Sequence, residues 1–341
     1  MIITPKLIPS LKRNLDVMKI QSLMLSVLLL CSGSSFSANA LSKDGAINHA
    51  NSSEFLRKIT PEFLYGYTDF NFDSTSGTNF NRYRGHSNLY SAGADHISLG
   101  QTMMAGIYYF GIDTELNSQF LLNPGVVTTS EQTIHNNTIF GHLFKIFTPE
   151  IYADLSAGYG FNKFITLTEI ATEPAPLIAQ ATNNNDNWFV SFNAIYRKTW
   201  KQWQMRANAG VLYSQIDTGR YNYFFPASDT FQVIDPLTNK ATLILENIEL
   251  GYYIKPTVMP FLSGGLIQVA QFSNSRPLVN PASDINGSLP QLNMDKSGFR
   301  VGGGIALTYK NATIRIEEKY YNAGGVFQSY QTLAALEYQF S

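Results

Sequence analysis

The side chains best suited to hydrolytic chemistry are the five histidines of the sequence, which are His49, His86, His96, His135 and His142. A hydrolase needs an imidazole beside a serine and an orienting carboxylate, or an Asp–His pair that activates water. Asp95 directly precedes His96, but adjacent residues on a β-strand point to opposite faces. His142 has no acid beside it, and His86 and His135 lie in or near expected loops. The sequence therefore predicts no enzymatic activity and no catalytic residue.

A second set of reactive side chains is charged and lies on the polar face of segments in which apolar and polar residues alternate. A period of two places all the charges of one segment on the same side of a sheet. Opposite charges on neighbouring strands can then form ion pairs, which either stabilise the structure or line a weakly selective pore. We expect the following residues to line a lumen: Arg197, Arg206, Arg300, Arg315, Lys319, Asp154, Glu249 and Glu317.

Composition excludes several classes of function. The single cysteine, Cys31, lies in an apolar stretch near the N-terminus, so the rest of the chain has no disulfide or thiol chemistry. The net charge of −1 leaves no broad basic face for nucleic acid. The sequence contains no phosphate-binding loop, zinc spacing or calcium loop, so we expect no cofactor and no metal. The slightly negative mean hydropathy argues against a helical membrane protein.

The elements that must position these residues are about twelve two-faced strands. Alternation is clearest after residue 150; for example, Ile151, Leu155 and Tyr159 share one face. Many strands exceed ten residues, which is enough to cross a bilayer at a tilt. The apolar stripes often end in Tyr, Trp or Phe, as expected at a membrane interface. The predicted strands are 61–73, 88–98, 101–116, 129–147, 150–171, 187–199, 202–218, 240–255, 257–272, 297–310, 312–322 and 328–340.

The connections between these strands alternate between short and long. The short ones are Ser98–Gln101, Thr148–Glu150, Lys201–Gln202, Lys255–Thr257 and Lys310–Asn311. The long ones are Ser74–Ser87, Asn117–Thr128, Ala171–Asp186, Gly219–Asn239 and Ser273–Lys296. Tight periplasmic turns opposite long extracellular loops are typical of outer-membrane proteins. The predicted fold is therefore all-β, a transmembrane antiparallel β-barrel of about twelve strands with both ends in the periplasm.

The N-terminus is typical of an export signal, which we place at residues 1–40. Lys12, Arg13 and Lys19 precede the apolar stretch Leu23–Leu30, and small residues end at Ala40. The bulky Leu30 argues against a lipid on Cys31. Residues 41–60 are then either a linker or a short helix that lies in the pore, and residues 61–341 form the barrel.

The last residues alternate apolar side chains in the pattern that marks barrel strands for insertion. Leu336, Tyr338 and Phe340 lie two apart and therefore project to one side, which we expect to face lipid. Ser341 follows the terminal aromatic residue, a small departure from the usual pattern. We expect the barrel-assembly machinery to read this strand, and the finished barrel to contact outer-membrane lipid.

Several short motifs give the region from about residue 60 to the end a family resemblance. Gly93-Ala94-Asp95 shortly precedes the tight turn Leu99-Gly100-Gln101, Pro260-Phe261 begins a late strand, and Val301-Gly302-Gly303-Gly304 is rich in glycine. With the twelve predicted strands, these features resemble the β-domain of autotransporters. The resemblance implies an outer-membrane barrel of a Gram-negative bacterium, with a helix ahead of it that fills the pore. The family normally carries a long passenger before the barrel, whereas only Leu41–Thr60 separates the predicted signal from the barrel in this sequence.

These observations leave three functional hypotheses. The first is a translocator-like or surface-exposed structural barrel, the second is a narrow, porin-like diffusion channel, and the third and weaker one is a barrel hydrolase. Conductance in planar bilayers separates the first two, and assays of lipid and peptide hydrolysis test the third. The sequence names no surface ligand.

Overall fold

The computed structural model describes residues 59–340 apart from 77–78, 123–125, 172–174 and 275–296. The predicted export signal and nearly all of the 41–60 segment therefore lie outside the described residues. Among the described residues, no helix is long and apolar enough to span a membrane. The strands are β1 (Thr60–Ser76), β2 (Asn79–Ser98), β3 (Met103–Leu122), β4 (Val126–Ile146), β5 (Ile151–Ile170), β6 (Leu177–Trp200), β7 (Trp203–Thr218), β8 (Tyr221–Phe225), β9 (Thr230–Ile234), β10 (Leu237–Tyr252), β11 (Val258–Asn274), β12 (Gly298–Tyr309), β13 (Ala312–Ala323) and β14 (Phe327–Tyr338).

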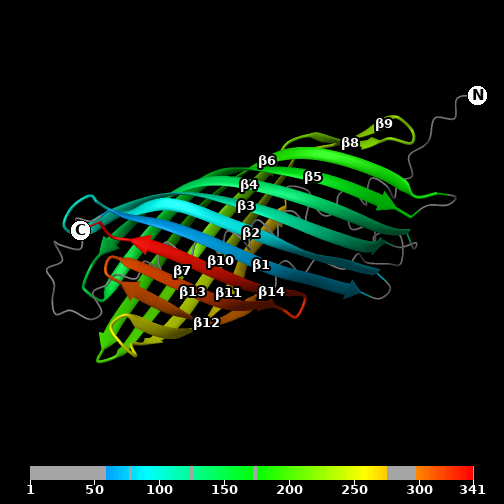
Figure 1. Ribbon diagram of the computed structural model, residues 1–341. Helices are drawn as coiled ribbons and strands as arrows, with labels where there is room; N and C mark the ends of the chain where they lie inside the picture. The colour runs from blue at the N-terminus through cyan, green and yellow to red at the C-terminus, as the bar shows by residue number, and fades with distance from the viewer. Residues whose placement is uncertain (1–58, 77–78, 123–125, 172–174, 275–296, 341) are drawn as a thin grey trace, which may run out of the picture.

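Twelve of these strands close into one antiparallel barrel, β1 to β7 followed by β10 to β14 (Figure 1). The last strand pairs with the first, with Glu337 opposite Glu62 and Phe327 opposite Phe72. β8 and β9 form a hairpin outside this ring, at the end of the barrel away from the C-terminus. A closed ring leaves no strand edge in lipid, where unpaired backbone groups are costly. The predicted fold class and strand number are confirmed.

Each barrel strand has an outer apolar face and an inner face that is buried. On β5, Leu155, Tyr159 and Ile165 are exposed, whereas Asp154 and Phe164 on the opposite face are buried. The same pattern identifies the outer face of β4, a strand whose sequence is apolar on both faces. There the odd-numbered side chains such as Ile139 and Leu143 are exposed, and the even-numbered His142 is buried.

Exposed aromatic side chains form two belts around the outer face. A periplasmic belt lies at the short turns and contains Phe147, Trp200, Trp203, Tyr309, Tyr338 and Phe340. An outer belt crosses the strands about eight residues further along and contains Tyr67, Tyr90, Tyr109, Tyr159 and Tyr330. Amphipathic rings are favoured at both membrane interfaces, so the apolar band between the belts is the surface that faces lipid.

The strands extend further beyond the outer belt than the sequence predicted. β2 begins at Asn79 rather than 88, and β6 begins at Leu177 rather than 187. The predicted loops Ser74–Ser87 and Asn117–Thr128 are therefore mostly strand, and Gly219–Asn239 contains the β8–β9 hairpin. Beyond the outer belt the outer face contacts water rather than lipid, so its residues need not be apolar and the alternation in the sequence weakens although the backbone ladder continues. The short turns lie where the sequence placed them.

Candidate functional site in the barrel lumen

The most highly charged part of the lumen centres on Arg315 of β13. Its guanidinium donates hydrogen bonds to both carboxylate oxygens of Glu249 on β10, at 3.2 and 2.5 Å, and to Glu317 on its own strand at 3.2 Å. All three side chains are buried. β11 and β12 lie between β10 and β13 in the ring, so the Arg315–Glu249 ion pair crosses part of the lumen rather than joining neighbouring strands.

Small residues on the inner face of β12 make room for this crossing. Gly302, Gly304 and Ala306 lie on that face, and a Cβ on Gly304 would approach a ring carbon of Phe261 to 2.6 Å. The Phe261 ring in turn lies under Arg315, with the guanidinium carbon 3.6 Å from the ring centroid. A cation held over an aromatic face at this distance gains a further favourable interaction. The Gly-rich motif thus has a direct packing role.

The other predicted lumen cations surround the same region. Lys319 forms an ion pair with Glu317 at 3.2 Å, and Arg206 on β7 lies directly opposite Glu249 on β10. Arg300 is buried on the inner face of β12. Arg197 on β6 donates to the Gln204 amide oxygen at 2.9 and 3.1 Å once that amide is oriented to accept.

Asp154 departs from the sequence interpretation, which paired it with an arginine or lysine. Its Oδ2 instead accepts a hydrogen bond from Nδ1 of His142 at 2.6 Å, and Asp95 Oδ1 lies 3.1 Å from the other ring nitrogen. All three side chains are buried. A ring that donates from both nitrogens to carboxylates is the imidazolium cation. The acids that were missing beside His142 in the sequence come from β2 and β5.

The opposite facing expected for Asp95 and His96 was also wrong. A β-bulge interrupts the β2–β3 pairing between Ala94 and Ile97, and His96 has a φ of 58°. The extra residue lets both side chains turn inward, and both are buried. The Gly-x-Asp motif is explained by the same packing, because a Cβ on Gly93 would lie 2.2 Å from the Tyr108 ring.

The extracellular half of the lumen contains a layer of buried apolar side chains, which the sequence reasoning did not foresee. Buried polar residues such as Asn81, Ser118 and Thr168 lie beside it. Phe70 stacks with Phe327 and Phe72 stacks with Tyr83, so aromatic rings continue across the seam between β14 and β1. Their inward direction could have been found by extending each alternating stripe past the outer belt. The buried cluster is Phe70, Phe72, Tyr83, Leu89, Phe110, Ile112, Leu116, Ile134, Phe164, Phe189, Leu212, Ile216, Ala241, Leu243, Leu245, Ile267, Tyr321, Ala323 and Phe327.

An asparagine ladder lines the wall formed by β4, β5 and β6. The amide of Asn162 donates to Asn185 at 2.5 Å and to Asn187 at 3.1 Å, and Asn136 donates to Asn187 at 3.3 Å. The lumen is therefore lined by a charged periplasmic region and, further out, by the apolar layer with this neutral polar wall beside it.

The predicted insertion residues lie on the outer face of β14 and just beyond it. Leu336, Tyr338 and Phe340 are all exposed, and the Tyr338 and Phe340 rings contact each other edge to face with centroids 5.4 Å apart. Tyr338 and Phe340 thus belong to the periplasmic belt, and Leu336 lies beside them on the same face.

A closed barrel with an apolar outer band, two aromatic belts and a polar periplasmic interior defines an outer-membrane β-barrel protein, and the cell outer membrane is its location. Residues 65–318 match the autotransporter beta-domain family. Because this match covers well over half of the chain, the protein belongs to that family. No curated protein sequence matches the chain.

Three solved structures of autotransporter domains share the fold. The translocator domain of NalP from Neisseria meningitidis has a TM-score of 0.62 and 10% identity, over 93% of this chain and 97% of that one. The beta domain of the Bordetella autotransporter BrkA has a TM-score of 0.53 and 13% identity, over 82% and 99%. The transport unit of AIDA-I from Escherichia coli has a TM-score of 0.51 and 10% identity, over 90% and 98%.

Proposed function

We propose that this protein is a translocator-type barrel whose lumen is shut to free diffusion until a polypeptide occupies it. The observation that carries the proposal is the combination of the Arg315–Glu249 ion pair across the lumen and the aromatic layer beyond it. Hydrated ions would have to break the first and pass the bulky apolar side chains of the second. A porin-like channel needs a continuous wet path instead.

The proposed function gives His142 a structural role rather than a catalytic one. Both nitrogens of His142 are held by carboxylates, so the ring has no nitrogen available to remove a proton from a nucleophile. The imidazolium is well placed to neutralise two buried acids, which is a structural role.

Assembly and export belong to the same proposal. Residues 1–40 would direct export and be removed after Ala40, and residues 41–60 would be a linker or a short helix in the pore. Leu336, Tyr338 and Phe340 would present the last strand to the barrel-assembly machinery. Their exposed position on one face of β14 supports this role.

Single-channel recording in planar bilayers tests the closed lumen. We expect the purified barrel to show only rare, brief openings, and the double variant Phe70→Ser/Phe327→Ser to conduct steadily, because it removes a stacked pair from the apolar layer. Phe231→Ser is the matched control, since Phe231 is exposed on the β9 hairpin outside the ring. A wild-type barrel that stays open would favour the diffusion channel and refute the proposal.

A further inference from the structure

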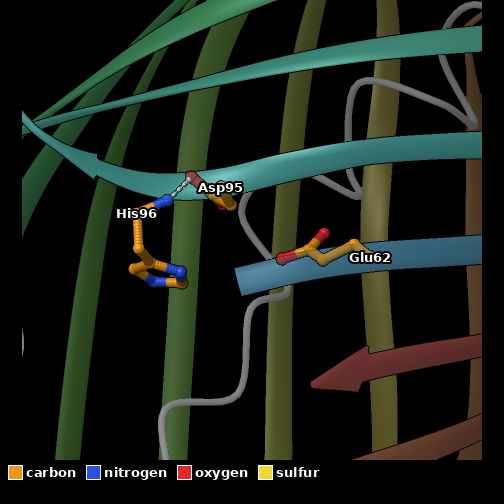
Figure 2. Close-up of side chains that lie close together, drawn as sticks. All are labelled: Glu62, Asp95 and His96. Carbon is orange, nitrogen blue, oxygen red and sulfur yellow. Dashed lines mark hydrogen bonds between the residues drawn. The ribbon is translucent and has the colours of Figure 1, made fainter. Parts of the chain in front are cut away.

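Three potential metal ligands converge near the periplasmic mouth, apart from the charged region around Arg315. Glu62 lies near the start of β1, and Asp95 and His96 lie near the end of β2 (Figure 2). One ligand atom from each lies within 4.8 Å of the other two. The bulge that turns His96 inward is what brings an imidazole to the two carboxylates.

Glu62 has an oxygen that the surrounding protein leaves unsatisfied. Its Oε2 accepts a hydrogen bond from the Tyr108 hydroxyl at 3.0 Å, whereas Oε1 is buried and accepts none from any described residue. A buried carboxylate oxygen without a partner is costly. Glu337 lies directly opposite Glu62 in the β1–β14 ladder, so a further acid adds negative charge to the same place.

We propose that Glu62, Asp95 and His96 form a binding site for a divalent transition-metal ion of the Zn²⁺ class. Two carboxylate oxygens and one imidazole nitrogen suit such an ion better than Ca²⁺ or Mg²⁺, which favour oxygen ligands alone. Tetrahedral Zn²⁺ with ligands at about 2.0–2.2 Å holds them about 3.3–3.6 Å apart, so a contraction of up to about 1.5 Å would complete the site.

The neighbouring contacts already orient two of the ligands. Asp95 Oδ1 accepts hydrogen bonds from the His96 backbone N–H at 2.6 Å and from His142 at 3.1 Å, and Tyr108 holds Glu62. Such outer contacts fix ligand direction in metal sites. An ion bound there would join β1 to β2 beside the seam where β14 closes the barrel.

Isothermal titration of the folded, EDTA-treated barrel with ZnCl₂ tests the site. Glu62→Gln keeps the size of the side chain, and His96→Asn suits a left-handed backbone because Asn tolerates positive φ. The matched control is His135→Asn, which removes an exposed His135–Asp113 pair with a 2.7 Å contact on the outer face. Heat-modifiable gel mobility reports whether each variant folds.

We expect one Zn²⁺ per barrel, an affinity at least about ten-fold lower in Glu62→Gln and His96→Asn, and no change in His135→Asn. Equal Zn²⁺ affinity in the wild type and both site variants, or no binding by the wild type, would overturn the proposal. X-ray absorption of the Zn²⁺-loaded wild type needs no variant. An imidazole signal with oxygen neighbours supports the site, and a spectrum without imidazole refutes it.

Discussion

Arg315 holds two buried carboxylates, Glu249 and Glu317, that would otherwise repel each other in the lumen. Its chain neighbour Ile316 is 45% exposed on the lipid-facing side. Adjacent residues of β13 therefore face different environments: Arg315 lies in the ion-paired lumen, and Ile316 faces the hydrocarbon of the bilayer. The inward direction of Arg315 and the outward direction of Ile316 can therefore be tested with one substitution at each of these neighbouring positions.

We expect Arg315→Leu to assemble and to leak cations, because water can enter the lumen to solvate the two freed carboxylates. Ile316→Arg should prevent stable insertion, since an arginine near the bilayer midplane costs about 2–4 kcal/mol on the lipid face. Heat-modifiable mobility measures the folded fraction, and planar-bilayer recording measures the leak. A comparable loss of folded barrel in both variants would contradict the facing.

Residue pairs within the lumen show which side-chain directions and contacts the sequence could predict and which it could not. Alternation correctly placed Arg315 and Glu317 on one face, because the strand there is regular. It failed for Asp95 and His96, where a bulge inserts one residue and reverses the phase. It also could not show that Asp95 and Asp154 meet at His142, because these residues come from three different strands whose register only the folded sheet fixes.

At the scale of elements, the last strand closes the barrel. β14 pairs with β13 on one side and β1 on the other, and Tyr338 lies opposite Ala312. Deleting Tyr338–Ser341 should prevent assembly and leave periplasmic aggregate, because it removes both the exposed aromatic pair and the end of the strand that must seal the ring. Mobility of outer-membrane fractions on unheated gels is the measurement.

Deletion of Ser341 alone is the control for that truncation. It leaves Phe340 as the terminal residue, so folding should be unchanged or slightly improved. A normal folded band from the four-residue truncation would show that these aromatic residues are not an insertion signal.

The strands themselves were predictable where lipid contacts one face and the lumen the other. All twelve barrel strands and the five short turns follow from alternation and from turn residues in the sequence. The extracellular ends of β2 and β6 did not follow, because water on the outer face removes the apolar stripe. The β8–β9 hairpin was missed for a related reason: its five-residue strands fall within a segment that the alternation of long and short connections assigned to a loop.

At the scale of the whole molecule, the orientation of the barrel can be tested by labelling. In a Cys31→Ser background the chain has no other cysteine. Glu169→Cys, exposed near the extracellular end of β5, should react with a membrane-impermeant maleimide on intact cells. Gln202→Cys, exposed in the short turn between β6 and β7, should react only after lysis. The reverse result would invert the assigned topology.

The spacing of the two aromatic belts has a consequence for where the barrel can reside. Tyr330 and Tyr338 on β14 are about eight residues apart, which corresponds to an apolar height of roughly 20–25 Å for a strand tilted by about 40°. A bilayer with a hydrocarbon core of about 30 Å would have to thin around such a short cylinder, at a cost that grows with each ångström of hydrophobic mismatch. The bacterial outer membrane is thinner than average. The apolar height of the barrel thus matches the outer membrane, and insertion into a thicker membrane would be less favourable.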